Sequence, residues 1–145
     1  MSLPVVLLAT ALPAAFAPVV PLVGHCWRGT LPDGGVDTHC FARARGGVRD
    51  RHVVRRRGRA VYAGVTDYVA AAGGLRWAYR NAGGPVMRGE VTARAGEIRL
   101  SVKNGAPLIW RWRGTRAYAA RVGPSGEAVT YRRVERGVTS GSARN

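Results

Sequence analysis

The sequence lacks helical periodicity and the motifs that mark common enzyme classes. From Cys26 onward, no stretch keeps apolar residues at i, i+3, i+4 and i+7 for three turns. No serine stands in a nucleophile-elbow context, and no glycine-rich loop joins a strand to a helix. These absences exclude a helical fold and give no sign of a nucleophile elbow or a phosphate-binding loop.

Lysine and acidic residues are also scarce. Lys103 is the single lysine, and with the arginines it makes 23 basic residues against 8 acids, a formal net charge of +15. A chain this basic is expected to associate with anionic partners in a salt-dependent way. Outside the cytoplasm the available anions are anionic lipid and polysaccharide, so nucleic acid is not the expected partner. Alternatively, the arginines alternate along solvated strand faces and keep the domain soluble.

Charge is absent from the first part of the chain. Residues 3–23 hold no charged side chain, and Ala15-Phe16-Ala17 resembles the A-x-A pattern that a signal peptidase reads. We therefore predict that residues 1–23 are a signal peptide and that the protein is periplasmic or secreted. The alternative is an inner-membrane anchor formed by residues 3–23, a length close to the ~20 apolar residues of a membrane-spanning helix. Four prolines interrupt that stretch and disfavour a straight helix.

The remainder is predicted to form one domain, residues 24–135, followed by a flexible tail, residues 136–145. Short alternating runs are separated by glycine-, proline- and asparagine-rich breaks, which is typical of antiparallel sheet. The predicted strands lie near residues 25–31, 36–43, 49–57, 60–70, 75–81, 86–94, 96–103, 107–113, 115–122 and 127–134.

Each predicted strand has one apolar and one basic face. In residues 75–80, Leu75, Trp77 and Tyr79 share a face, and arginines occupy the other. Short connections imply that consecutive strands pair, and closure removes the unpaired edges. The predicted fold is all-β, a single antiparallel meander barrel of about eight to ten strands.

The two cysteines are predicted to form a disulfide. Cys26 and Cys40 flank the turn at residues 32–35 almost symmetrically, so a hairpin places them across from one another. An oxidising compartment would favour the bond. The repeated dipeptides His25-Cys26 and His39-Cys40 also suit zinc. Neighbouring residues on a strand point to opposite faces, however, so we predict neither a metal site nor a cofactor.

Two acid–histidine pairs are the only candidates for catalysis. Asp37 and His39 share a strand face, as do Asp50 and His52, and either pair could orient a general base. The simpler interpretation is a polar contact that supports a strand or rim. We expect no catalytic residues and a non-enzymatic protein, with a hydrolase as the remote alternative.

A family resemblance supports the barrel. The segment Gly24-His25-Cys26-Trp27 at the start of the first strand, followed by an antiparallel meander, resembles the calycin group of lipocalins and fatty-acid-binding proteins. Those barrels begin with Gly-x-Trp, where this chain has Gly-x-x-Trp. Thr66-Asp67-Tyr68 is also similar to a lipocalin motif. The resemblance implies a barrel that holds a small apolar ligand.

Aromatic residues are the candidate ligand wall. On apolar strand faces we place Trp77, Tyr79, Trp110 and Trp112. The last strand adds Tyr131 and Arg133, which are similar to the arginine and tyrosine that hold ligand carboxylates in fatty-acid-binding proteins. This anchor requires that their face points inward, and otherwise Ala128, Thr130 and Arg132 would line the interior.

The leading prediction is an exported barrel that binds a small amphipathic or anionic ligand. The alternative is a cell-envelope protein with a filled interior, whose basic surface docks on anionic lipid or polysaccharide.

Overall fold

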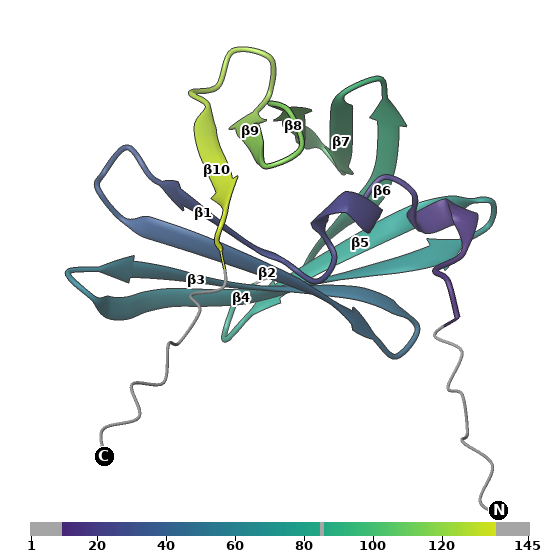
Figure 1. Ribbon diagram of the computed structural model, residues 1–145, viewed down its shortest axis with the longest axis horizontal. Coiled ribbons are helices and arrows are strands. Elements are labelled where there is room, and N and C mark those ends of the chain that lie inside the picture. The colour runs from purple at the N-terminus through teal and green to yellow at the C-terminus, as the bar shows by residue number, and fades with distance from the viewer. Residues whose placement is uncertain (1–9, 85, 136–145) are drawn as a thin grey trace, which may run out of the picture.

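Ten strands from the described residues, 10–84 and 86–135 of this computed structural model, close into an antiparallel barrel (Figure 1). Each strand pairs with its sequence neighbours, and β10 returns to pair with β1. The strands are β1 Cys26–Thr30, β2 Val36–Ala44, β3 Gly47–Arg56, β4 Arg59–Ala71, β5 Gly74–Asn81, β6 Met87–Arg94, β7 Glu97–Val102, β8 Gly105–Trp112, β9 Ala117–Val122 and β10 Val129–Arg133. The predicted all-β meander barrel is confirmed, and the predicted tail, 136–145, lies outside the described residues.

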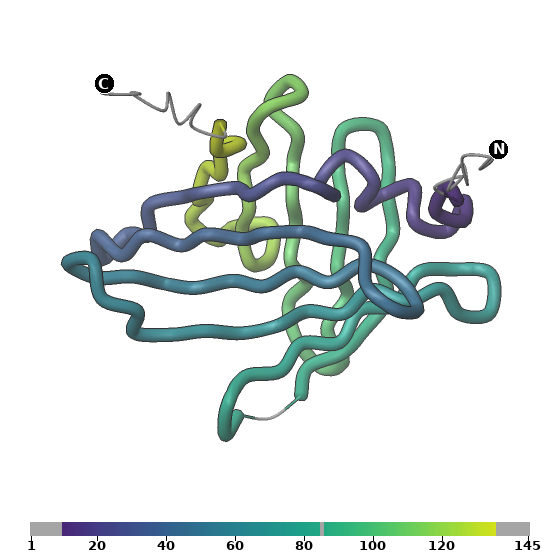
Figure 2. Tube along the Cα trace, turned by 60° about the horizontal axis from the view of Figure 1, so that its bottom comes forward, coloured from purple at the N-terminus to yellow at the C-terminus, as the bar shows by residue number. Residues whose placement is uncertain are grey.

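Tight turns explain why the strands begin and end where they do. Gly46 and Gly96 lie between paired strands with φ of 84° and 73°, a backbone region that side chains disfavour. Turns of this kind force the chain to reverse within two residues, so successive strands pair along their length. Figure 2 shows β1–β4 crossing over the later strands, which enclose the interior from the other side.

Alternation along the strands fills the interior with aromatic and aliphatic side chains. Trp27 on β1, Phe41 on β2 and Trp77 on β5 are each at most 2% exposed. The predicted inward face of residues 75–79 is also confirmed, because Leu75 and Tyr79 are buried together with Trp77. The core therefore lies inside a single closed sheet.

A short N-terminal segment closes one end of the barrel. It consists of two 3-10 helices, η1 (Ala14–Phe16) and η2 (Val20–Leu22), and η1 lies against β4 and β5 (Figure 1). Their buried side chains Phe16, Val19 and Leu22 belong to the barrel core. The indole of Trp27 donates a hydrogen bond to the carbonyl of Leu22, with a donor–acceptor distance of 3.3 Å. We call residues 14–22 the plug.

The plug lies within the segment that the sequence suggested as a signal peptide or anchor. Residues 1–9 of that segment are outside the described residues, so its processing stays a prediction. What the structure adds is that residues 14–22 pack as part of the barrel. Among the described residues there is no helix with the length and apolar character needed to cross a bilayer.

The predicted disulfide is confirmed. Cys26 and Cys40 are direct partners in the β1–β2 register, and their sulfurs are bonded. The bond lies one residue away from the inward-facing Trp27 and Phe41, and it therefore points to the outer face. It joins the first two strands beside the plugged end and is compatible with an oxidising compartment.

Candidate functional site

The register of two strands brings both acid–histidine pairs together inside the barrel. His39 on β2 is the direct register partner of His52 on β3. Asp50, two residues before His52 on the same inner face of β3, is the register partner of Phe41. Asp37 lies two residues from His39 on the same inner face. The four residues Asp37, His39, Asp50 and His52 form one group, which we call the Asp–His cluster.

His39 is the centre of this cluster. Its Nδ1 lies 2.6 Å from Oδ2 of Asp50, and its Nε2 lies 3.1 Å from Oδ2 of Asp37. The Nε2 atom is also 3.2 Å from Nδ1 of His52. Tyr131 on β10 donates its hydroxyl to Oδ2 of Asp37 over 2.8 Å. Four residues of β2 and β3 and a tyrosine from β10, on the far side of β1, are thus held in one polar network.

The network fixes different charges on the two histidines. Burial alone would lower the pKa of His39, but the charge of Asp50 and hydrogen bonds to both aspartates outweigh it and raise the pKa to about 9. Burial lowers the pKa of His52, and the nearby positive charge of His39 lowers it further. At neutral pH, His39 is therefore an imidazolium and His52 is neutral. With two carboxylates, the cluster carries a net charge of −1.

Three buried polar atoms of the cluster have no hydrogen-bond partner among the described residues. They are Oδ1 of Asp37, Oδ1 of Asp50 and Nε2 of His52. Buried polar atoms are paired in the large majority of cases, because an unpaired one forfeits its hydration without compensation. The cluster therefore has hydrogen-bonding or ligating capacity that its own residues do not use.

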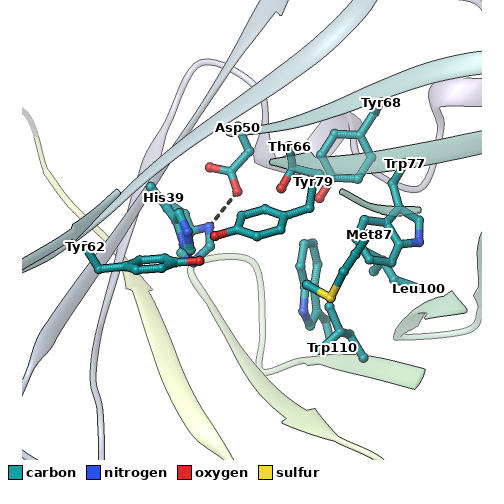
Figure 3. A pocket seen from close by; sticks show the side chains of 12 residues that line it. His39, Asp50, Tyr62, Thr66, Tyr68, Trp77, Tyr79, Met87, Leu100 and Trp110 are labelled. Atoms are coloured by element: carbon teal, nitrogen blue, oxygen red, sulfur yellow. Dashed lines mark hydrogen bonds and ion pairs between the residues drawn. The ribbon is translucent and has the colours of Figure 1, made fainter. Parts of the chain in front are cut away.

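A cavity of about 210 Å³ extends from the cluster through the barrel interior (Figure 3). Figure 3 shows the rings of Tyr62 and Tyr79 near His39, while Met87 lies near Trp77 and Trp110. Both tyrosine rings also pack edge-on against His52, with ring centroids 5.4 Å and 5.7 Å apart. The polar end of the cavity is formed by His39, Asp50 and His52. Its remaining wall is Tyr62, Thr66, Tyr68, Trp77, Tyr79, Met87, Leu100, Leu108 and Trp110.

A second hollow of about 240 Å³ borders His39 from the other side. Leu108 and Trp110 line both spaces and separate them. The second hollow extends past Tyr131 to Glu127 in the β9–β10 loop, at the end of the barrel opposite the plug. His39 is therefore reached from two sides of a partly filled interior.

A glycine makes room for the histidine at the cavity wall. Gly64 on β4 is the register partner of His52. A Cβ atom at position 64 would lie 2.6 Å from the hydroxyl oxygen of Tyr79 and 2.7 Å from Nε2 of His52. The absence of a side chain here leaves room for both groups over the backbone of Gly64.

Some of the predicted wall residues meet in the cavity. Trp77, Tyr79 and Trp110 line it. Tyr131 is 6% exposed and faces inward. The sequence allowed either face of β10 to point inward, and the inward one is the face that carries Tyr131. Trp112 lies elsewhere: its ring packs against Trp27, with ring centroids 5.6 Å apart, toward the plugged end.

Arg133 is not part of either hollow that borders His39. Its Cα pairs with that of Trp27, and its Nε lies 3.9 Å from a carboxylate oxygen of Glu135. Two residues along a strand cover about 6.6 Å, so the inner position after Tyr131 is displaced toward the plugged end. The proposed pairing of Tyr131 and Arg133 around one anionic group is not seen.

The sequence indicates two separate acid–histidine pairs. It gives no direct sign that the two pairs meet, or that Tyr62 and Met87 line the cavity. One signal was present: the two-residue turn at Arg45-Gly46 pairs Ala44 with Gly47, and counting outward from there places His39 opposite His52.

No protein-family model, no curated protein and no solved structure matches this chain.

Proposed function

We propose that the protein is an exported, non-enzymatic binding protein that holds a small, largely apolar ligand inside its barrel. The observation that carries this proposal is the cavity of about 210 Å³, whose walls are aromatic and whose polar groups gather at one end. Specific small-molecule sites combine an apolar wall with a few convergent polar groups in this way. The Cys26–Cys40 disulfide supports the exported location.

The size and shape of the cavity favour a ligand with an aromatic ring. An apolar cavity of about 150 Å³ accepts benzene, so this space accommodates one substituted ring. The rings of Trp77 and Trp110 offer surfaces against which a planar ligand can stack.

The charge of the Asp–His cluster favours a neutral or cationic polar end on the ligand. Two carboxylates outnumber one imidazolium, so a buried carboxylate ligand would meet net repulsion. Oδ1 of Asp50 can accept a hydrogen bond, and Nε2 of neutral His52 can donate one. A hydroxyl or an ammonium group therefore complements the cluster better than the anion suggested by Arg133.

Binding accounts for the cluster better than hydrolysis does. Both ring nitrogens of His39 donate to aspartates, so this imidazolium cannot accept a proton from a nucleophile. Among the described residues that line the cavity there is no serine or cysteine. The hydrolase alternative thus lacks a serine or cysteine nucleophile beside a histidine base in this cavity, where Thr66 supplies the aliphatic hydroxyl.

Tryptophan fluorescence tests the proposal with three probes of one ring size: para-ethylphenol, para-ethylbenzylamine and para-ethylbenzoate. We expect saturable quenching by the phenol and the amine, with the benzoate at least about tenfold weaker, a difference of about 1.4 kcal/mol. Thr66→Phe, which fills the cavity, should abolish quenching. Val65→Phe, on the outer face of the same strand, should leave quenching unchanged.

Two outcomes would contradict this proposal. If the benzoate binds tightly and Arg133→Met abolishes that binding, then the ligand is an anion held by Arg133. Absence of saturable quenching by all three probes would favour a barrel without an internal ligand.

The basic outer surface supports a second candidate, docking on anionic lipid or polysaccharide. Arg28 on β1 and Arg132 on β10 are exposed and directly opposite in the register. Like charges in such positions repel each other, and an external anion relieves that repulsion. Among the described residues, neither arginine has a carboxylate within ion-pair distance.

A further inference from the structure

Three side chains of the Asp–His cluster present metal-ligand atoms to one another at close range. Nε2 of His39 lies 3.1 Å from Oδ2 of Asp37 and 3.2 Å from Nδ1 of His52. Oδ1 of Asp37 lies 3.6 Å from the same Nδ1. One carboxylate and two imidazoles, from neighbouring strands, therefore converge on a single point inside the barrel.

The two separations from Nε2 of His39, 3.1 Å and 3.2 Å, are close to the distance between corners of a tetrahedral zinc site, and either oxygen of Asp37 can supply the third corner. Zinc binds imidazole nitrogen and carboxylate oxygen at about 2.0–2.2 Å, which places neighbouring ligand atoms about 3.3 Å apart. We propose that Asp37, His39 and His52 form a binding site for a divalent transition-metal ion, with zinc as the ion that fits best. The ion takes the place of the proton on Nε2 of His39, which is released to solvent, because a metal-binding imidazole is neutral. This inference does not depend on the organic ligand proposed above.

The surroundings of the three residues are those of a supported metal site. Nδ1 of His39 donates to Asp50 over 2.6 Å, which orients the ring so that Nε2 points at the other two ligands. Metal-binding histidines commonly donate their second nitrogen to a carboxylate in this manner. On the other side, the hydroxyl of Tyr131 holds Oδ2 of Asp37.

An unpaired atom gives a second, independent indication. The side chain of Asp37 is only 8% exposed, and its Oδ1 has no hydrogen-bond partner among the described residues. This oxygen faces Nδ1 of His52 at 3.6 Å, where a bridging cation would satisfy both atoms. A divalent ion between Nε2 of His39 and Nδ1 of His52 would also replace their direct contact of 3.2 Å with two metal–nitrogen bonds.

The donor set decides which ions suit the site. Two imidazoles and a carboxylate favour zinc and its transition-metal neighbours over magnesium or calcium, which prefer oxygen ligands alone. Cysteine takes no part, because Cys26 and Cys40 are joined in the disulfide. Both imidazoles line the cavity, so the fourth coordination position is directed toward the space where water or a ligand can enter.

The test uses the full chain, stripped with a chelator and then titrated with Zn²⁺ by calorimetry and with Co²⁺ by visible absorption. We expect one ion per chain and the intense visible bands of tetrahedral Co²⁺. Asp37→Asn and His52→Asn should each weaken zinc binding at least about 100-fold. Asp50→Asn, which removes only the partner of His39, should weaken binding about 10- to 100-fold.

His25→Asn is the matched control. Of the three histidines in the chain, His25 is the one that lies outside the cluster. Its replacement should therefore leave the affinity for zinc unchanged. Circular dichroism and the melting temperature confirm that each variant is folded. Zinc should raise the melting temperature of wild type and His25→Asn, but not that of Asp37→Asn.

Two results would overturn the metal site: absence of saturable zinc binding in wild type, or equal loss of affinity in His25→Asn and His52→Asn. Thr66→Phe separates the two proposals, because it should block the aromatic probes while zinc binding persists. Should His52→Asn fail to fold, His52→Gln provides the same comparison with a longer amide side chain.

Discussion

At the scale of single residues, Gly64 shows how closely the site is packed. A Cβ atom at this position would come within 2.5 Å of the ring of Tyr79 and 2.7 Å of Nε2 of His52. Both side chains line the cavity, so a shift of either one to admit a methyl group changes the cavity wall. Glycine is needed here for space.

We predict that Gly64→Ala lowers the free energy of unfolding by about 1–3 kcal/mol, the usual effect of overpacking a filled interior. The variant should also bind the aromatic probes more weakly, because Tyr79 is displaced. Urea unfolding measures the first effect and fluorescence titration the second. Gly74→Ala is the control: the nearest atom to its added Cβ is 3.9 Å away, so it should change stability by less than about 0.5 kcal/mol.

The charge of His39 predicts a pH dependence of stability in metal-free protein. The pKa of His39 is about 9 in the folded protein and about 6.5 when unfolded, so protonation favours the folded state. This contribution is fully present below pH 6.5 and is lost as the pH rises through 9. The shift corresponds to a loss on the order of 3 kcal/mol.

Denaturant unfolding at several pH values, with chelator present, measures this loss. Asp50→Asn should flatten the profile, because the carboxylate that favours imidazolium is then gone. A free energy of unfolding that stays constant between pH 6.5 and 9.5 would show that His39 does not carry the charge assigned to it.

At the scale of elements, the strands were predictable and the site was not. Each strand is a local pattern, such as Leu75, Trp77 and Tyr79 in alternation, bounded by glycine-rich turns. Inspection of a few adjacent residues reveals such a pattern. All ten predicted ranges correspond to strands, with ends that differ by at most two residues.

The cluster depends instead on residues that are distant along the chain. His39 and His52 belong to different strands, and their contact follows only from the pairing register. Tyr131 reaches Asp37 across 94 residues, and only closure of the barrel brings these two together. Arg133 shows the converse: its two-residue spacing from Tyr131 suggested one site, yet the strand carries it toward the plugged end.

The role of the plug is not evident from the sequence. Its apolar residues resemble the core of a signal peptide, but Phe16, Val19 and Leu22 are at most 2% exposed within the barrel. Apolar composition alone cannot distinguish a segment read by an export system from one that closes a core. Removal of residues 1–23 would take all three side chains away.

We predict that Phe16→Ala lowers the free energy of unfolding by about 3–5 kcal/mol, because a fully buried aromatic ring leaves a cavity. Val20→Ala is the matched control in the same segment. Val20 is 47% exposed, and its replacement should cost less than about 0.5 kcal/mol. Equal and small losses in both variants would mean that the plug adds nothing to the barrel, and that processing can extend through it.

At the scale of the whole molecule, the charge is arranged with its sign reversed between inside and outside. The chain carries a net charge of +15, whereas the Asp–His cluster in the interior has a net charge of −1. Some outer arginines are neutralised locally: Arg99 and Arg111 both donate to Glu97 and hold the pKa of that carboxyl down, at about 2. Arg28 and Arg132 have no such partner among the described residues and are available to external anions.

We predict that binding to vesicles of anionic phospholipid weakens steeply with salt, because screening shortens the reach of exposed charge from about 30 Å at 0.01 M to about 3 Å at 1 M. Replacing both Arg28 and Arg132 with Gln should weaken binding more than replacing both Arg99 and Arg111. The two double variants lose the same formal charge. Co-sedimentation across a salt series measures both effects, and identical losses would point to net charge rather than to this pair of arginines.

The plug at one end of the barrel also governs the kinetics of whatever the interior holds. Within the described residues, Phe16, Val19 and Leu22 close one end, while Tyr62 and Met87, the exposed residues of the cavity wall, are 39% and 43% exposed. Access to the cluster is therefore confined to the rest of the barrel, where one way runs along the aromatic wall and a second runs past Tyr131 and Glu127. A ring held by the aromatic wall would block the first way and leave the second. An ion held by the cluster would then exchange through the second hollow whether or not the organic molecule is bound.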